Sequence, residues 1–280
     1  MRNLLFFGLL TLLAGCKAPV TAVPASTIGK NYQLYTAEVS RNQTSRVRLL
    51  VIHYTAEDFA NSLRLLTQGE VSAHYLIPEQ PPLSAGRPVA WQLVPESQAA
   101  WHAGISYWRG AVQLNSVSVG IELENQGYRC SLLGGCRWAP YSLAQVTLLT
   151  PLARDIVQRH QIAPQNVVAH SDIAPQRKAD PGPLFPWKAL ADAGIGAWPD
   201  ADRVRFYLGG RVPNEPVTPR LLLDKLARYG YEVSDSMTAQ QQQRVIAAFQ
   251  MHFRAQRYDG VADAETEAIV DSLLEKYGGQ

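Results

Sequence analysis

The 280-residue sequence lacks several features that would assign a chain to a special class. Its 26 basic and 24 acidic residues give a net charge of +2, and no basic block stands out, so nothing points to nucleic acid as a partner. There is no internal repeat. No tryptophan follows Trp198, since all six lie between Trp91 and Trp198, which indicates two differently built modules. Apolar residues at 46% and charged residues at 18% are typical of a globular protein of one or two domains.

The apolar run near the N-terminus is too short to cross a bilayer. It extends from Leu4 to Leu13 behind Arg2, which is the length of a signal-peptide core. Its end, Leu-Ala-Gly-Cys16, resembles a bacterial lipobox, whose cysteine is lipidated and becomes the first mature residue. An ordinary secretory signal with an incidental cysteine is the alternative. Lys17 is not acidic, which in Gram-negative lipoproteins favours anchoring in the outer membrane, facing the periplasm. We therefore expect residues 1–16 to be a signal peptide and 17–30 a tether.

Cysteine is scarce after this point. Only Cys130 and Cys136 remain, and they flank a flexible segment that could close on itself. An oxidising periplasm would permit a disulfide, and two free thiols are the alternative. A metal site is less favoured, because no second Cys/His pair lies nearby.

Alternating strand and helix signals predict an α/β domain over residues 31–194, with a mixed central sheet flanked by helices. Ser142, with Gln145 three residues later, predicts a capped helix to about His160, which Pro151 should kink or divide. The other predicted elements are strands over Val47–Ile52, Val117–Leu123 and Asn166–Ala169, and a short helix from Pro186 to near Gly194.

The C-terminal part predicts a small bundle of three helices. Residues 195–217 are rich in glycine and proline and are expected to be a connector. Helix starts follow at Thr218-Pro219, at Thr238 and at Asp263, which gives a helical domain over residues 218–280.

Two of the predicted strands end in histidine, at His53 and at His170. The carboxyl ends of strands in α/β sheets are where ligands bind, although one such histidine alone would more often be a core residue. Asp180 lies ten residues after His170, in a loop stiffened by prolines, and can fold back beside it. Two imidazoles and one carboxylate suit Zn²⁺ and leave a fourth position for water, which is a catalytic stoichiometry.

Four segments together resemble the amidase-2 family of N-acetylmuramoyl-L-alanine amidases, which includes phage lysozymes and the peptidoglycan recognition proteins. They are Ile52-His-Tyr-Thr55, Trp101-His-Ala-Gly104, Ser118-Val-Gly-Ile-Glu-Leu-Glu124 and His170-Ser-Asp-Ile-Ala-Pro-Gln-Arg-Lys-Ala-Asp-Pro-Gly-Pro183. The resemblance covers about Val47 to Gly194. It implies zinc-dependent hydrolysis of the amide between N-acetylmuramic acid, including its anhydro form, and the L-alanine of peptidoglycan stem peptides.

The resemblance also implies roles for single residues. His53, His170 and Asp180 match the zinc ligands, Glu122 the general base, and Lys178 the residue that stabilises the oxyanion. Some relatives have a tyrosine where this chain has Ala73, which places more of the work on Glu122. Two rival assignments remain, namely Glu124 as the base, and His74 or His102 as ligands.

Substrate contacts are expected from Tyr54, Trp101, His102, Asn115 and Arg177. Trp101, Trp108 and Trp138 could stack on sugar rings, and packing in the core is the alternative for each. Arg177 could also be a plain solvated charge.

The C-terminal bundle resembles a peptidoglycan-binding module, through Phe249-Gln250, Tyr258-Asp-Gly260 and Ala264-Glu-Thr-Glu-Ala268. A structural cap on the catalytic domain is the alternative. The expected partners are peptidoglycan or muropeptides and, through Cys16, the membrane; no protein partner is evident. Two other functions stay open: a non-catalytic peptidoglycan receptor, and a zinc peptidase that cuts within the stem peptide. The sequence does not choose between anhydro and ordinary muramic acid, nor does it give the oligomeric state.

Overall fold

The structure, a computed structural model, describes residues 38–131 and 135–278. Residues 1–44 and 45–280 form two separate units, and the account below concerns the second. The predicted signal peptide, the lipobox with Cys16 and the tether over residues 17–30 lie outside the described residues.

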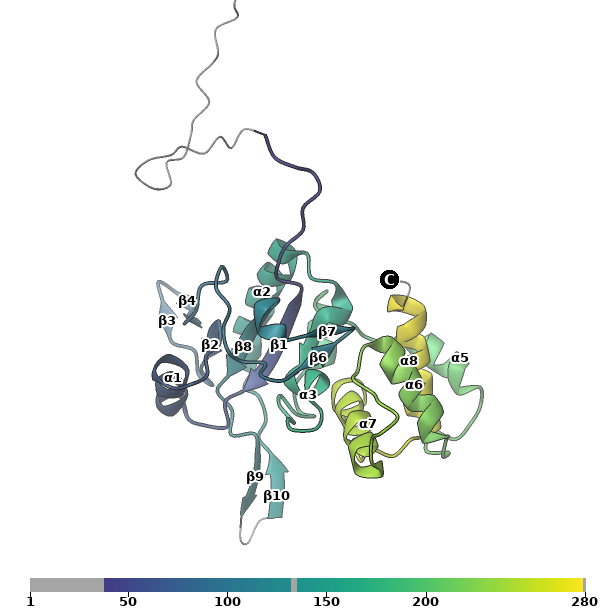
Figure 1. The fold of residues 1–280 in the computed structure, drawn as a ribbon. Coiled ribbons are helices and arrows are strands. Elements are labelled where there is room, and N and C mark those ends of the chain that lie inside the picture. Colours follow the sequence, from purple (N-terminus) through teal and green to yellow (C-terminus); the bar gives the residue numbers. More distant parts are fainter. Residues whose placement is uncertain (1–37, 132–134, 279–280) are drawn as a thin grey trace, which may run out of the picture. The chain divides into compact units, whose positions relative to one another are not determined.

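A mixed five-stranded sheet forms the centre of the second unit (Figure 1). Its order is β11-β1-β8-β2-β5, in which β11, β1, β8 and β2 are parallel neighbours and β5 pairs antiparallel at the edge. The strands are β1 (Leu49–Tyr54), β2 (Tyr75–Ile77), β5 (Trp91–Gln92), β8 (Ser118–Leu123) and β11 (Val167–Ala169). The predicted mixed α/β class is therefore confirmed.

In the described residues, three antiparallel ribbons lie outside this sheet. They are β3 (Leu83–Ser84) with β4 (Arg87–Pro88), β6 (Tyr107–Trp108) with β7 (Ala111–Val112), and β9 (Tyr128–Ser131) with β10 (Gly135–Trp138). Cys130 and Cys136 are directly opposite each other in the last ribbon and form a disulfide, which decides between the two alternatives left open by the sequence.

The two faces of the sheet pack against different layers, because successive side chains of a strand point to opposite sides. On β1, Leu50 and Ile52 join a core with residues of α2 (Leu143–His160). Leu49 and Val51 face the other way and join a second core. His53 continues this second series, so the fold directs its imidazole to the face away from α2.

The remaining helices begin at the predicted places in the C-terminal part. Thr218, Thr238 and Asp263 are the N-cap residues of α6 (Pro219–Tyr229), α7 (Ala239–Phe253) and α8 (Ala264–Tyr277). The side chains of Thr238 and Asp263 accept the expected backbone hydrogen bonds. The other helix bounds are α1 (Phe59–Gln68), α3 (His170–Ile173), α4 (Trp187–Asp192) and α5 (Ala201–Leu208), with short 3-10 turns at Leu114–Ser116 and Pro164–Asn166.

Several expectations about α2 and its surroundings need correction. The helix continues through Pro151 and is not divided there, with Leu148, Leu149 and Ala153 on its flanking turns buried against the sheet. A kink at this proline stays a prediction. Ser142 caps it as predicted, but the Gln145 amide does not close a capping box and instead donates to the carbonyls of Ile77 and Glu124. The expected connector, residues 195–217, contains the unpredicted helix α5.

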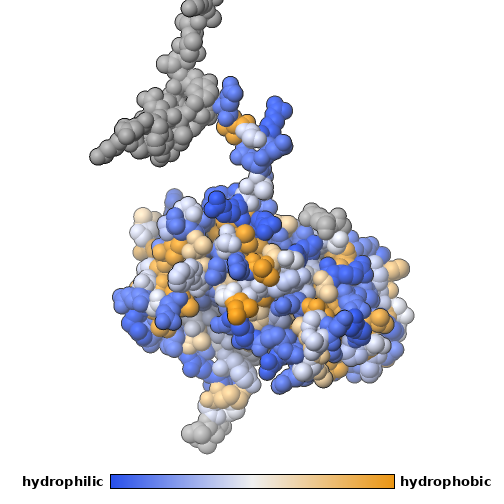
Figure 2. All heavy atoms as spheres, in the orientation of Figure 1, coloured by the Kyte–Doolittle hydropathy of each residue, from blue (hydrophilic) through white to orange (hydrophobic). Residues whose placement is uncertain are grey.

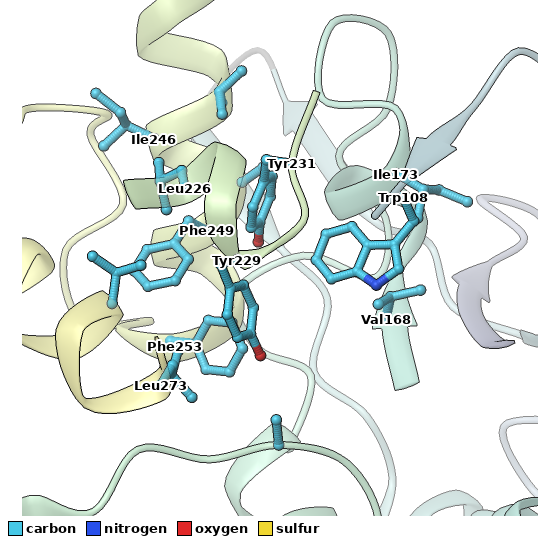
Figure 3. Close-up of a cluster of buried hydrophobic side chains, with 14 of the residues drawn as sticks. Trp108, Val168, Ile173, Leu226, Tyr229, Tyr231, Ile246, Phe249, Phe253 and Leu273 are labelled. Carbon is cyan, nitrogen blue, oxygen red and sulfur yellow. The ribbon is translucent and has the colours of Figure 1, made fainter. Parts of the chain in front are cut away.

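The C-terminal helices share a core with the sheet (Figure 3). Trp108 packs edge-on against Tyr231 and Tyr229, with ring centroids 5.1 and 6.0 Å apart. The other buried members include Val168 and Ile173 from the sheet side and Leu226, Phe249 and Phe253 from the helices. The bundle thus contacts α3 and α4 and, through Trp108 and Ile173, shares this core with the face of the sheet to which His53 points.

Polar and apolar side chains are mixed on the surface, and on the face in Figure 2 the apolar ones form several separate groups. Within the described residues, none of the helices combines the length and the apolar character needed to cross a membrane.

Candidate metal centre and active site

His53 lies on β1, one residue before the strand ends, and is paired in register with Glu122 on β8. Residues paired across two parallel strands point to the same face of the sheet. The imidazole and the carboxylate are therefore placed together by strand register alone.

The second histidine and the aspartate come from one loop. His170 follows β11 as the first residue of α3, and the Ser171 amide donates to the Asp180 carbonyl at 2.9 Å, which folds the loop back as its spacing predicted. Gly182, at φ +79°, lies against Trp138, where a Cβ atom would come within 2.6 Å of the indole. Only glycine allows this close approach, so the segment after Asp180 packs against Trp138 of the β9–β10 ribbon.

Three ligand atoms converge at this point. His53 Nδ1 and His170 Nδ1 are 2.9 Å apart, and Asp180 Oδ2 is 3.1 Å from the first and 3.0 Å from the second. The three side chains are 1%, 3% and 6% exposed. All three atoms fall within 4.8 Å of one another, so one cation could touch them all.

The donor set fits a metal ion better than it fits a network of hydrogen bonds. His170 Nε2 faces the Ala103 carbonyl at 3.2 Å, and since a carbonyl only accepts, this nitrogen carries the hydrogen and Nδ1 presents a lone pair. Asp180 adds a carboxylate, whose pKa is held well below its ordinary value by His170 and His53 although burial acts to raise it. Converging lone pairs and a negative charge at a buried position favour the binding of a cation there. Two imidazoles with one carboxylate are a ligand set that suits zinc.

A cavity of about 430 Å³ opens at this centre. His170 and Asp180 lie in its wall, with Glu122 and Lys178 beside them, and Leu65, Leu66 and Val71 give it an apolar side. A cavity that combines an apolar wall with a few convergent polar groups is typical of a substrate site.

Glu122 is half-buried in the cavity wall and is not engaged as a structural group. In the described part of the chain, no donor lies within hydrogen-bond distance of its Oε2 atom, which is itself buried. Burial and the nearby charge of Asp180 raise the pKa of Glu122 to about 8, against the opposing effect of Lys178. A cation at the three ligand atoms would favour the carboxylate form again. A carboxyl group poised in this way is suited to proton transfer.

The family profile described as "N-acetylmuramoyl-L-alanine amidase" matches residues 43–183, which contain all five of these polar residues. The chain belongs to this amidase family. AmiD of Escherichia coli, an N-acetylmuramoyl-L-alanine amidase, is 57% identical to it over 95% of both chains.

Solved structures of two relatives have the same fold as this chain. The complex of Escherichia coli AmiD with the substrate anhydro-N-acetylmuramic acid-L-Ala-D-γ-Glu-L-Lys superposes with a TM-score of 0.86, at 59% identity, covering 89% of this chain and 97% of that one. AmpDh3 of Pseudomonas aeruginosa in complex with anhydromuramic pentapeptide gives a TM-score of 0.78 at 41% identity, covering 90% and 98%.

The two rival assignments in this amidase receive no support from the geometry. Both carboxylate oxygens of Glu124 accept backbone amides, from Phe59 at 2.9 Å and from Glu79 at 2.7 Å, so this group is occupied structurally. His74 is buried, and its Nδ1 accepts from the Gly120 amide, which leaves no lone pair for a metal.

Three of the expected substrate contacts of the amidase have structural partners instead. The carbonyl of the Asn115 side chain accepts from the amides of His102 and Ala103, so Asn115 shapes their loop and does not line the cavity. Arg177 reaches the cavity, but its guanidinium is bound to the carbonyls of Ala103 and Ile105. His102 also lines the cavity, and its ring, buried behind His53, bonds to His53 Nε2, so its contact with substrate stays a prediction.

Tyr54 and Trp101 do line the cavity of the amidase, and Trp101 is 65% exposed there. They therefore stay predicted substrate contacts. Trp108 is a core residue, and Trp138 packs between Tyr54 and Tyr128. Lys178 lies exposed at the cavity wall.

Proposed function

We propose that this protein is a zinc-dependent N-acetylmuramoyl-L-alanine amidase that hydrolyses the amide between muramic acid and the L-alanine of peptidoglycan stem peptides. The observation that carries the proposal is the meeting of His53 Nδ1, His170 Nδ1 and Asp180 Oδ2 beside Glu122, whose Oε2 atom has no hydrogen-bond partner among the described residues. The family match and the substrate named with the Escherichia coli relative support the same bond.

His53, His170 and Asp180 would hold the metal. Zinc, when bound there, supplies a Lewis acid that polarises the amide carbonyl and lowers the pKa of water. Metals other than zinc accept nitrogen and oxygen ligands too, but a set of two imidazoles and one carboxylate with an open position is common among catalytic zinc sites.

Glu122 acts as the proton carrier. Its carboxylate takes a proton from the attacking water as the new C–O bond forms at the carbonyl carbon. It then gives this proton to the amide nitrogen as the C–N bond breaks, so the products are a free muramic acid carboxylate and a stem peptide with a free L-alanine amine. Burial helps this role, because a carboxyl group with a raised pKa gives up its proton less readily to solvent.

Lys178 supplies positive charge near the carbonyl oxygen, where negative charge develops during the attack. Its position at the cavity wall supports this role, and no other cationic side chain in the described lining is free, since Arg177 is held by two backbone carbonyls. Tyr54 and Trp101 would then contact the substrate from the rim.

Muramic acid in its anhydro form is included in the proposed substrate. The relatives from Escherichia coli and Pseudomonas aeruginosa are named as complexes with anhydro-muramic peptides. We also propose that residues 31–194 are the catalytic domain and that the helices over 218–280 bind the wall polymer, in line with their resemblance to a peptidoglycan-binding module.

Anchoring in the outer membrane is proposed from the lipobox alone. Cys16 would carry the lipid and place the enzyme on the periplasmic side of that membrane. Metabolic labelling with a radioactive or clickable fatty acid tests this, with Cys16→Ala as the matched variant, and equal label in both would overturn the assignment.

Mass spectrometry of purified sacculi after digestion tests the reaction. We expect intact stem peptides with a free L-alanine amine, and their loss in EDTA and return on adding zinc. Shorter peptides would instead indicate a peptidase, and binding of sacculi without release of peptides would indicate a receptor.

A further inference from the structure

We propose that His102 and Ser118 are positioning residues that fix the tautomer of His53, so that its Nδ1 lone pair faces the metal. The inference rests on the proposed metal role of His53. Its starting point is a buried chain of hydrogen bonds behind the imidazole, which runs from His53 through His102 and Ser118 to the carbonyl of Leu114.

The direction of every bond in this chain follows from its last member. The Leu114 carbonyl can only accept, so the Ser118 hydroxyl, 2.7 Å away, gives its hydrogen to it. Ser118 Oγ is then the acceptor for His102 Nε2 at 3.1 Å, and this nitrogen must carry the hydrogen.

The same reasoning continues to the metal centre. With its hydrogen on Nε2, a neutral His102 has a lone pair on Nδ1, which accepts from His53 Nε2 at 2.9 Å. His53 therefore carries its hydrogen on Nε2, and its Nδ1 presents a lone pair beside His170 and Asp180.

Backbone geometry holds this chain of hydrogen bonds, called the relay below, in place. The His102 ring lies on Gly120 of β8, where a Cβ atom would be 2.5 Å from the ring, so only glycine lets the ring lie there. The Asn115 side chain fixes the amides of His102 and Ala103, and Ala103 in turn accepts from His170 Nε2. One loop thus orients both imidazole ligands, and such outer partners set the affinity of a metal site.

Zinc affinity of the full chain tests the relay, measured by competition with a chromophoric chelator. Ser118→Ala removes the fixed acceptor, lets His102 adopt either tautomer, and is expected to raise the zinc dissociation constant about tenfold. Ser118→Thr keeps the hydroxyl and should stay near the parent. Ser272→Ala is the matched control, because Ser272 is a buried serine that bonds to the Asp200 backbone far from His53.

A second pair of variants separates the relay from simple packing. His102→Asn is smaller but keeps an acceptor oxygen near the Nδ1 position, whereas His102→Leu keeps bulk and has no acceptor. The relay predicts that Asn retains more zinc affinity than Leu. Tighter zinc binding by Leu than by Asn, or a parent-like constant for Ser118→Ala, would overturn it.

Nuclear magnetic resonance of histidine-labelled, zinc-loaded protein reads the relay directly. We expect a scalar coupling across the hydrogen bond from His53 Nε2 to His102 Nδ1, with the hydrogen on His53. A hydrogen found on His102 Nδ1 would contradict the inference while leaving the proposed function intact. A parent protein that binds no zinc would overturn both.

Discussion

Replacement of Glu122 by glutamine removes the proposed proton carrier with little change in shape. General acid–base catalysis contributes about 10²–10⁴-fold, so kcat should fall by that factor, which corresponds to roughly 2.7–5.4 kcal/mol in the activation barrier. Zinc content should not change, because Glu122 is outside the group of converging ligand atoms. The folded protein should lose no stability, since Oε2 has no hydrogen-bond partner among the described residues.

The assay is hydrolysis of a purified anhydro-muramoyl tripeptide, followed by chromatography, with zinc measured in the same samples. Glu124→Gln is the matched control from two residues along the chain. It should keep kcat but lose about 1–3 kcal/mol of stability, because its new amide group would face one of two backbone amides that now donate to the carboxylate. A zinc-loaded Glu122→Gln enzyme with more than a tenth of the parent kcat would refute the assignment of the base.

Four further outcomes are expected. His170→Ala should abolish activity and the rise in melting temperature on adding zinc, which in the parent corresponds to about 2.7 kcal/mol at one hundred times the dissociation constant; a zinc-dependent rise in the variant would count against the ligand assignment. Lys178→Met should lower kcat about 10²-fold at unchanged zinc affinity, and kinetics equal to the parent would remove Lys178 from the mechanism. Phe249→Ala should cost about 3–5 kcal/mol in denaturant unfolding, because its ring is fully buried in the shared core; a cost below about 1 kcal/mol would contradict that packing. Burial acts to raise the pKa of Glu96, but hydrogen bonds from Arg159, Tyr75 and His160 lower it from 4.5 to about 2. This carboxylate therefore stabilises the fold above pH 4.5, and the contribution is lost as the pH falls to 2. Glu96→Gln should flatten this part of the curve of stability against pH, and an unchanged curve would disprove the coupling.

The sequence predicts those features of the fold that depend on residues close together in the chain, such as helix starts and the loop from His170 to Asp180. Helix starts at Thr238 and Asp263 follow from side chains that cap the first turn, and these need only neighbours three residues away. The ten-residue spacing between His170 and Asp180 predicted their approach for the same reason. Helix α5 was missed, because none of its residues is fully buried and no apolar stripe marks it.

The site was predictable down to its ligands but not to its supporting partners. Strand alternation puts Glu122 and Glu124 on one side, and only the distant amides of Phe59 and Glu79 show which of the two is occupied. The role of Asn115 depends on a loop that folds against it from thirteen residues away. The role of Ser118 could not be predicted, because a serine in a strand has no distinctive pattern. Only the fold shows that Ser118 and Gly120, two residues apart on one strand, both lie against the ring of His102.

The buried contact of Tyr231 with Trp108 has a consequence for the pattern of cutting along a wall strand. Because both rings are enclosed in one core, a swing of the helices relative to the cleft would expose them to water, and the loss of buried apolar contact opposes it. A glycan strand that touches both would be cut at a stem peptide a constant number of sugars from its point of contact. The offset between the point of contact and the cut would then be set by the fold.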